Sequence, residues 1–213
     1  MNNLIQSTME FVRSELENEG SGHDWWHIFR VTKTARRIAE KEGADLLICT
    51  MAALLHDLAD EKLNETEEAG VKRVTDWLDQ IKVTGNQREQ ILTIIQSISF
   101  KGGHGPTLNS LEAKVVQDAD RLDAIGAIGI ARCFTYAGSK GNIIHDPETI
   151  PREGMSLEEY RKRDGTAINH FYEKLLRLKD LMKTNTGYEM AKQRHQFMEH
   201  YLEEFFDEWS SIK

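Results

Sequence analysis

The spacing of hydrophobic residues along the chain is helical almost throughout. An early stripe recurs at intervals of three or four positions and consists of Ile5, Met9, Val12 and Leu16. Such spacing places apolar side chains on one face of an α-helix. Strand-like alternation of apolar and polar residues is nearly absent. The pattern therefore predicts an all-α protein.

The same periodicity, read with helix start and stop signals, divides the chain into a series of helices. They are expected at about residues 2–18, 24–42, 45–57, 65–81, 85–98, 110–137, 156–182 and 186–211. Gly43 is expected to end the second helix, and Asp45 to cap the third. Asn64 with Glu67 has the spacing of a capping box at the start of the fourth.

No repeat, low-complexity tract or linker divides the chain, and only 3 prolines occur in its 213 residues. We therefore expect one domain over residues 1–213. Its core is expected at about 20–137, with a C-terminal helical extension at about 156–211 packed over it.

Composition narrows the class of protein. Hydrophobic residues make up 39% of the chain and charged residues 29%, as in soluble globular proteins. The formal net charge of −8 gives no general attraction for nucleic acid, so an anionic substrate would need a bound cation or a few placed basic groups. No stretch approaches the ~18 apolar residues of a membrane span, and the expected location is the cytoplasm. Cys49 and Cys133 lie in apolar helical stretches and are expected to be buried thiols.

Four potential metal ligands lie on three predicted helices. His27 is in HDWWHIFRV, His56 and Asp57 end the apolar run LLICTMAALLHDLAD, and Asp120 is in VVQDADRLDAIGAIG. Burying a lone ionised carboxylate is expensive, and one divalent cation would offset that cost for His56, Asp57 and Asp120 together. Each residue alone has an ordinary explanation, such as a core histidine at position 27. Their combination in this order is much less common by chance.

These motifs resemble the HD superfamily of metal-dependent phosphohydrolases. The resemblance rests on HDWWHIFRVTKTA, AALLHDLADEK and DADRLDAIGAIGIAR. Downstream, INHFYEKLLRLKDLM and RHQFMEHYLEEF resemble a bacterial subgroup of small stand-alone members. The resemblance implies a helical fold in which His27, His56, Asp57 and Asp120 hold one divalent metal ion. Mn²⁺ is the preferred expectation, and Mg²⁺, Ni²⁺, Co²⁺, Fe²⁺ and Zn²⁺ also suit mixed imidazole and carboxylate ligands.

The resemblance also selects between neighbouring candidates. His27 is preferred over His23 because it begins a His-x-x-x-Val turn, and Asp120 over Asp118 and Asp123 because it directly precedes an Arg-Leu pair. Asp123, one helical turn further on, is either a group that supports a ligand or a helix-surface charge.

Catalytic and substrate-binding candidates surround the metal motif. Asp60 follows the His-Asp pair by three residues, where related nucleotidases have an acid that acts on the attacking water, and Glu61 is its rival. Both could instead be surface acids that end a helix. The candidates for contacts with phosphate or sugar are Lys62, His104, Arg132, His170 and Lys174. One tryptophan of the Trp25–Trp26 pair is expected in the core.

The leading functional hypothesis is hydrolysis of (deoxy)nucleoside triphosphates to monophosphate and pyrophosphate. The alternative within the same class is a phosphomonoesterase acting on nucleoside 5'-monophosphates. The alternative outside the enzymes is a non-catalytic HD-type nucleotide-binding module. Such a module is expected to lack one or more of the metal ligands, whereas all candidate ligands are present in this chain. The expected partner is a small-molecule nucleotide, with no nucleic acid or membrane, and the protein is a monomer or a homodimer.

Overall fold

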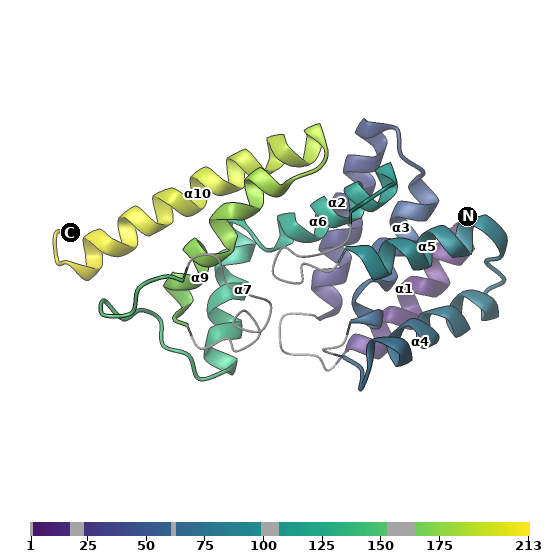
Figure 1. Cartoon of the computed structure of the whole chain (residues 1–213), viewed down its shortest axis with the longest axis horizontal. Coiled ribbons are helices and arrows are strands. Elements are labelled where there is room, and N and C mark those ends of the chain that lie inside the picture. Colours follow the sequence, from purple (N-terminus) through teal and green to yellow (C-terminus); the bar gives the residue numbers. More distant parts are fainter. Residues whose placement is uncertain (1, 18–23, 61–62, 99–106, 153–164) are drawn as a thin grey trace. The chain divides into compact units, whose positions relative to one another are not determined.

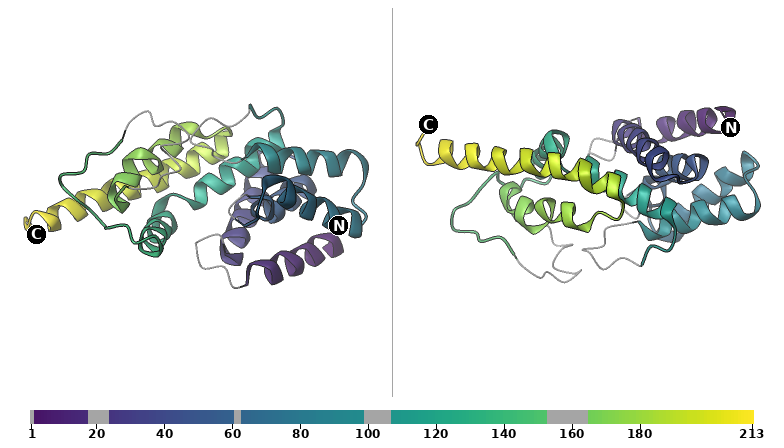
Figure 2. Two further views of the ribbon diagram at one scale, coloured as in Figure 1. Left: turned by 60° about the horizontal axis from the view of Figure 1, so that its bottom comes forward. Right: turned by 90° about the horizontal axis from the view of Figure 1, so that it is seen from above.

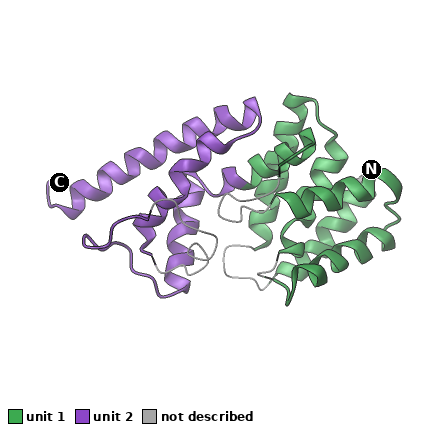
Figure 3. Cartoon of the chain, viewed as in Figure 1, with its two compact units in different colours: residues 1–120 green, residues 121–213 purple. Residues whose placement is uncertain are grey.

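The structure is a computed structural model and describes residues 2–17, 24–60, 63–98, 107–152 and 165–213. Among these residues every regular element is a helix, and none is a strand (Figure 1). The predicted all-α class is confirmed. No described helix is long and apolar enough to cross a membrane. The chain divides into two compact units, residues 1–120 and 121–213 (Figure 3). The single-domain interpretation stays a prediction.

The first unit is built around one apolar helix. Its elements are α1 (Asn2–Leu16), α2 (Trp25–Glu42), α3 (Leu46–Leu55), the 3-10 helix η1 (Asp57–Ala59), α4 (Glu67–Gln80), α5 (Gly85–Ser97) and most of α6 (Leu111–Asp123). Helix α3 packs against α1, α2 and α5, and all its residues from Ile48 to Leu55 are buried. A helix that is apolar on every side must be buried in this way. Whatever follows it directly, here His56 and Asp57, is therefore carried into the interior.

Local signals fix the ends of the helices that carry the candidate ligands. Asp24 caps α2 by accepting a hydrogen bond from the backbone N–H of His27 at 2.8 Å. The same helix ends at Gly43, whose φ of 75° is in the left-handed region that favours glycine. Asp45 caps α3 by accepting two backbone hydrogen bonds. The predicted roles of Gly43 and Asp45 are thus confirmed.

The second unit contains the end of α6 and the later helices α7 (Gly126–Ser139), α9 (Ala167–Glu173), η3 (Leu175–Leu181) and α10 (Asn185–Trp209). Helices α7 and η3 both contact α9 and the long α10 (Figure 2). Phe171 is fully buried, and its ring stacks on that of Tyr201 with 5.9 Å between the centroids. This contact joins α9 to α10.

The predicted continuous helix over residues 110–137 was wrong. Helix α6 ends at Asp123, Ile125 is extended, and α7 begins at Gly126 with a φ of 75°. A left-handed residue cannot continue a right-handed helix, and glycine adopts it without steric cost. The described part of the predicted helix 156–182 is likewise divided into α9 and η3, which are separated by Lys174.

The predicted capping box at Asn64 and Glu67 was also wrong. Thr66 is the cap of α4, and its hydroxyl accepts from the backbone N–H of Ala69 at 3.1 Å. The Asn64 amide instead donates to Leu58 and Asp60, two residues that precede it in the chain. The Asn64 side chain is therefore directed back toward η1.

A buried carboxylate anchors the segment after α7 to α9. Glu173 is only 7% exposed and accepts hydrogen bonds from Arg152, at 3.0 Å from its backbone N–H and at 2.9 and 3.1 Å from its guanidinium. The side-chain amide of Asn169 donates to the carbonyl of Thr149 at 2.9 Å. Burial works to raise the pKa of Glu173, but the hydrogen bonds and charge of Arg152 hold it below its ordinary value.

This anchor predicts a pH-dependent loss of stability in Glu173→Gln. At pH 7 the substitution should lower the free energy of unfolding by about 1–3 kcal/mol, because it removes charge-assisted hydrogen bonds from a buried site. The stabilisation by a carboxylate whose folded pKa is lowered is present above its ordinary pKa of 4.5, and it is lost as the pH falls through the folded value. Urea unfolding from pH 7 to pH 3 should therefore show the difference between wild type and variant shrinking on the acidic side.

The matched control is Glu189→Gln. Glu189 is exposed and pairs only weakly with Lys192, at 3.3 Å on the same helix. Its substitution should change the free energy of unfolding by less than about 0.5 kcal/mol at every pH. Equal effects of the two substitutions would contradict an anchoring role for Glu173.

Candidate metal centre

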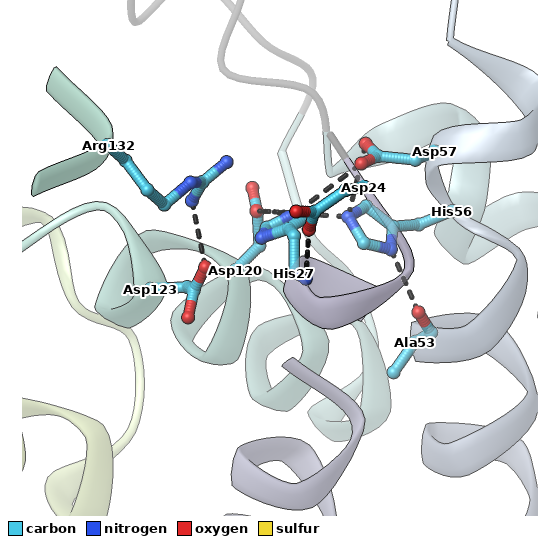
Figure 4. A network of polar contacts seen from close by, with 8 residues as sticks. All are labelled: Asp24, His27, Ala53, His56, Asp57, Asp120, Asp123 and Arg132. Atoms are coloured by element: carbon cyan, nitrogen blue, oxygen red, sulfur yellow. Dashed lines mark hydrogen bonds and ion pairs between the residues drawn. The ribbon is translucent and has the colours of Figure 1, made fainter. Parts of the chain in front are cut away.

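Side chains from α2, from α6 and from the turn after α3 gather inside the first unit (Figure 4). His27 of α2, His56 and Asp57 offer ligand atoms that all lie within 4.8 Å of one another, and all three residues are buried. Asp120 of α6 joins them, with its Oδ1 3.5 Å from Nε2 of His27 and 3.8 Å from Nε2 of His56. The structure thus brings together the four predicted ligands.

The two imidazoles lie in the interior, and the His56 ring is held by a backbone carbonyl. His27 is fully buried, three residues after the cap of α2. Nδ1 of His56 lies 2.9 Å from the carbonyl oxygen of Ala53, one turn earlier in α3. Because a carbonyl can only accept, Nδ1 must carry a hydrogen there, which leaves the lone pair of Nε2 in the neutral ring directed at the carboxylates.

The spacing of the ligand atoms suits one small cation. Nε2 of His27 lies 3.4 Å from Oδ2 of Asp57, and Nε2 of His56 lies 3.3 Å from Oδ1 of the same carboxylate. Atoms that each bind one ion at about 2.1 Å are roughly 3.0–3.4 Å apart when they are neighbours in octahedral or tetrahedral geometry. The observed separations are close to these values.

The electrostatics of the cluster favour added positive charge. Burial works to lower the pKa of His56, but the charges of Asp57 and Asp120 and the backbone contact with Ala53 raise it to about 9. For Asp120, burial works to raise the pKa, whereas the neighbouring imidazoles of His56 and His27 hold it below its ordinary value. A proton on His56 is therefore strongly favoured, and a divalent cation would supply the same compensation with a larger charge.

One buried atom tests whether a metal ion fits. Nε2 of His56 is buried and has no hydrogen-bond partner among the described residues. A buried polar atom of this kind calls for an explanation, and an ion is one of them. Two imidazoles and two carboxylates are donors that suit Mn²⁺, Fe²⁺, Co²⁺, Ni²⁺ or Zn²⁺. The residues therefore fit a divalent cation.

The predicted catalytic acid follows the centre directly. Asp60 ends η1, is half-buried, and donates its backbone N–H to the carbonyl of Asp57 at 3.0 Å. Its rival Glu61, together with Lys62 and His104, lies outside the described residues.

Of the tryptophan pair, Trp25 is buried and Trp26 is 56% exposed, so the expectation of one core indole is confirmed.

The remaining predicted substrate-binding residues belong to the second unit. Arg132 donates to the buried Asp123 at 2.9 Å (Figure 4) and so joins α7 to the end of α6. Lys174 directly follows α9, and its backbone N–H donates to the carbonyl of His170 in that helix at 3.0 Å. Contacts of these three residues with a substrate stay a prediction.

Sequence reasoning missed three supporting groups. The cap at Asp24 could have been recognised, because an Asp directly before a helical apolar pattern is a start signal. The carbonyl of Ala53 carries no sequence signal. Arg194 donates to the carbonyl of Leu122, which lies 72 residues earlier in the chain. Burial lowers the pKa of its guanidinium against the opposing charge of Asp123.

Two histidines and two aspartates in this order, with His27, His56 and Asp57 buried, agree with the resemblance seen in the sequence. The HD domain model matches residues 25–125 of the chain. The protein YpgQ of Bacillus subtilis is 45% identical over 190 residues, which cover 88% of this chain and 85% of YpgQ. The chain belongs to the HD-domain family.

Solved structures agree with this assignment over nearly the whole chain. A protein from Lactobacillus plantarum has a TM-score of 0.88 at 41% identity, covering 99% of each chain. An HD-superfamily hydrolase from Bacillus thuringiensis has a TM-score of 0.79 at 47% identity, covering 98% of each. The crystal structure of YpgQ in complex with ADP has a TM-score of 0.77 at 39% identity, covering 98% of this chain and all of YpgQ (100%).

Proposed function

We propose that this protein is a metal-dependent nucleotide phosphohydrolase that converts (deoxy)nucleoside triphosphates to monophosphates and pyrophosphate. The observation that supports it most is the cluster formed by the buried His27, His56 and Asp57 with the partly exposed Asp120, in which Nε2 of His56 has no hydrogen-bond partner among the described residues. The family relationship adds support, since a similar protein from Bacillus thuringiensis is an HD-superfamily hydrolase.

His27, His56, Asp57 and Asp120 are the proposed ligands of one divalent cation, with Mn²⁺ as the preferred ion. When bound, such an ion lowers the pKa of a coordinated water and polarises a phosphoryl oxygen. The chain's own contribution is positional. The Ala53 carbonyl keeps Nδ1 of His56 protonated, so that Nε2 is available as a donor to the ion. The side chain of Asp120, 32% exposed, leaves the cluster open to solvent on its side.

The nucleotide as substrate is supported by chemistry and by a relative. A chain with a net charge of −8 attracts a polyphosphate only where positive charge is concentrated, and the metal centre would be such a place. YpgQ, which is similar along its whole length, has been crystallised with ADP. Nucleotide binding is thus the proposal for this chain as well.

The proposed reaction is attack of water at the α-phosphorus. Asp60, with Glu61 as its rival, orients that water and accepts its proton. Five further groups are proposed to hold the phosphates and sugar: Lys62, His104, Arg132, His170 and Lys174. So many basic groups exceed the needs of one phosphate, which favours a triphosphate over a monophosphate. Pyrophosphate then departs as a good leaving group.

The ligand set is tested by metal content. Wild-type protein should bind one divalent cation per chain. His56→Ala should weaken Mn²⁺ binding by more than about 100-fold, since loss of even an outer partner of a ligand costs roughly 10–100-fold. Isothermal titration of metal-stripped protein measures this, with circular dichroism to confirm that the helices remain.

His195→Ala is the matched control for this test. His195 is also buried on a helix and also pairs with a carboxylate, that of Glu199 at 3.2 Å, but it belongs to the second unit. Its removal should leave Mn²⁺ affinity within about two-fold of wild type. Full affinity in His56→Ala would contradict the ligand assignment.

The catalytic acid is tested by Asp60→Asn. The variant should keep its metal and lose turnover by a factor on the order of 10²–10⁴, the usual contribution of general acid–base catalysis. Glu61→Gln should lose less. Steady-state kinetics on a nucleotide panel measure both, and the reverse ranking would make Glu61 the working carboxylate.

The bond that is cut is tested in ¹⁸O-labelled water. Hydrolysis of a nucleoside triphosphate should place the label in the monophosphate and release unlabelled pyrophosphate, with no diphosphate on the way. Mass spectrometry of the products decides this. Orthophosphate as the sole released phosphorus product, formed from nucleoside monophosphates, would instead identify a phosphomonoesterase. Metal and nucleotide binding without turnover would identify a binding module.

A further inference from the structure

The turn after α3 carries two of the proposed functional acids on very little secondary structure. Asp57 begins η1 and Asp60 follows its last residue. The backbone N–H of Asp60 donates to the carbonyl of Asp57 at 3.0 Å. A single 3-10 turn has weak hydrogen-bond geometry and is not rigid on its own. Something outside the turn must therefore fix its backbone.

Asn64 provides such a contact. Its Nδ2 donates to the carbonyl of Leu58 at 2.8 Å and to the carbonyl of Asp60 at 2.9 Å. A side-chain amide nitrogen has two hydrogens, and these two carbonyls take both. The amide therefore joins the carbonyls on either side of Ala59 and holds the turn in one shape.

Gly70 of α4 lies directly against the same turn. A Cβ atom at this position would lie 2.7 Å from the carbonyl oxygen of Ala59 and 2.7 Å from Nδ2 of Asn64. Real Cβ atoms do not approach other atoms so closely. Gly70 lies within a helix and its φ is not positive, so it is close approach, and not backbone conformation, that requires glycine here. Three consecutive carbonyls, from Leu58 to Asp60, are thus covered by Asn64 and Gly70.

We propose that Asn64 and Gly70 are positioning residues for the metal centre. They hold the backbone of the Asp57–Asp60 turn in one conformation. The Asp57 carboxylate then faces the two imidazoles, and the Asp60 side chain has a fixed orientation. This inference rests on the proposed function, because it assigns a role toward the proposed metal. Outer groups that orient ligands in this way control affinity as well as turnover.

The test is the affinity of Asn64→Asp for Mn²⁺ and Co²⁺, measured by isothermal titration. The substitution keeps the shape of the side chain but turns an oxygen toward the carbonyls of Leu58 and Asp60. The dissociation constant should rise by roughly 10–100-fold. The visible absorption spectrum of the Co²⁺-loaded protein should also change, because the angle at which Asp57 meets the ion changes. Gly70→Ala, which displaces the turn from the other side, should act in the same direction.

Asn169→Asp is the matched control. Asn169 is buried in the second unit and also donates its side-chain amide to a backbone carbonyl, that of Thr149 at 2.9 Å. Its loss should lower the Tm as the loss of Asn64 does, but it should leave the Co²⁺ spectrum unchanged and metal affinity within about two-fold. A purely structural role for Asn64 would make the two variants alike.

The outcomes separate this inference from the proposed function. Wild-type protein that binds no divalent cation would overturn both. Wild-type protein that binds metal, with Asn64→Asp and Gly70→Ala equal to it in affinity and spectrum, would overturn only the positioning role. If Asn64→Asp does not fold, the metal affinity and the Co²⁺ spectrum of Gly70→Ala decide the question in its place.

Discussion

The attraction between two carboxylates and two imidazoles at the buried end of α3 is the interaction on which the candidate site depends. Helix α3 is apolar on all sides, and its burial carries His56 and Asp57 into the interior. Buried carboxylates require compensating positive charge. The raised pKa of His56, about 9, expresses that requirement, and a divalent cation would meet it better than a proton.

Because the carboxylates of the cluster are paired with histidines, their partners can also act as metal ligands. In the second unit the buried carboxylates of Asp123 and Glu173 are paired with arginines. A guanidinium keeps its proton at any ordinary pH and has no lone pair to offer. An imidazole can lose its proton and become a ligand. The first unit therefore has a cluster suited to a metal ion, whereas these pairs of the second unit serve to join segments.

The candidate centre is held from outside by backbone contacts. The cap at Asp24 fixes the first turn of α2, the Ala53 carbonyl fixes the ring of His56, and the amide of Asn64 contacts the turn that follows Asp57. Each of these contacts uses a group that is not itself a proposed ligand. Rigid presentation of this kind reduces the freedom that ligands lose when they bind an ion.

The sequence by itself determined the all-α class, the cap at Asp45 and the stop at Gly43, because these depend on local periodicity and on residue chemistry. The resemblance of its motifs to the HD superfamily selected the four candidate ligands. The tertiary structure decided what depends on distant contacts. The break before Gly126 goes with the close packing of Arg194 against that glycine, and Arg132 is paired with Asp123. The Asn64 amide turned back to η1 and did not cap α4, because two carbonyls of that turn lie within its reach and Thr66 already serves as the cap. A pattern of residue types cannot choose between two such partners, because the choice depends on which one the fold brings near.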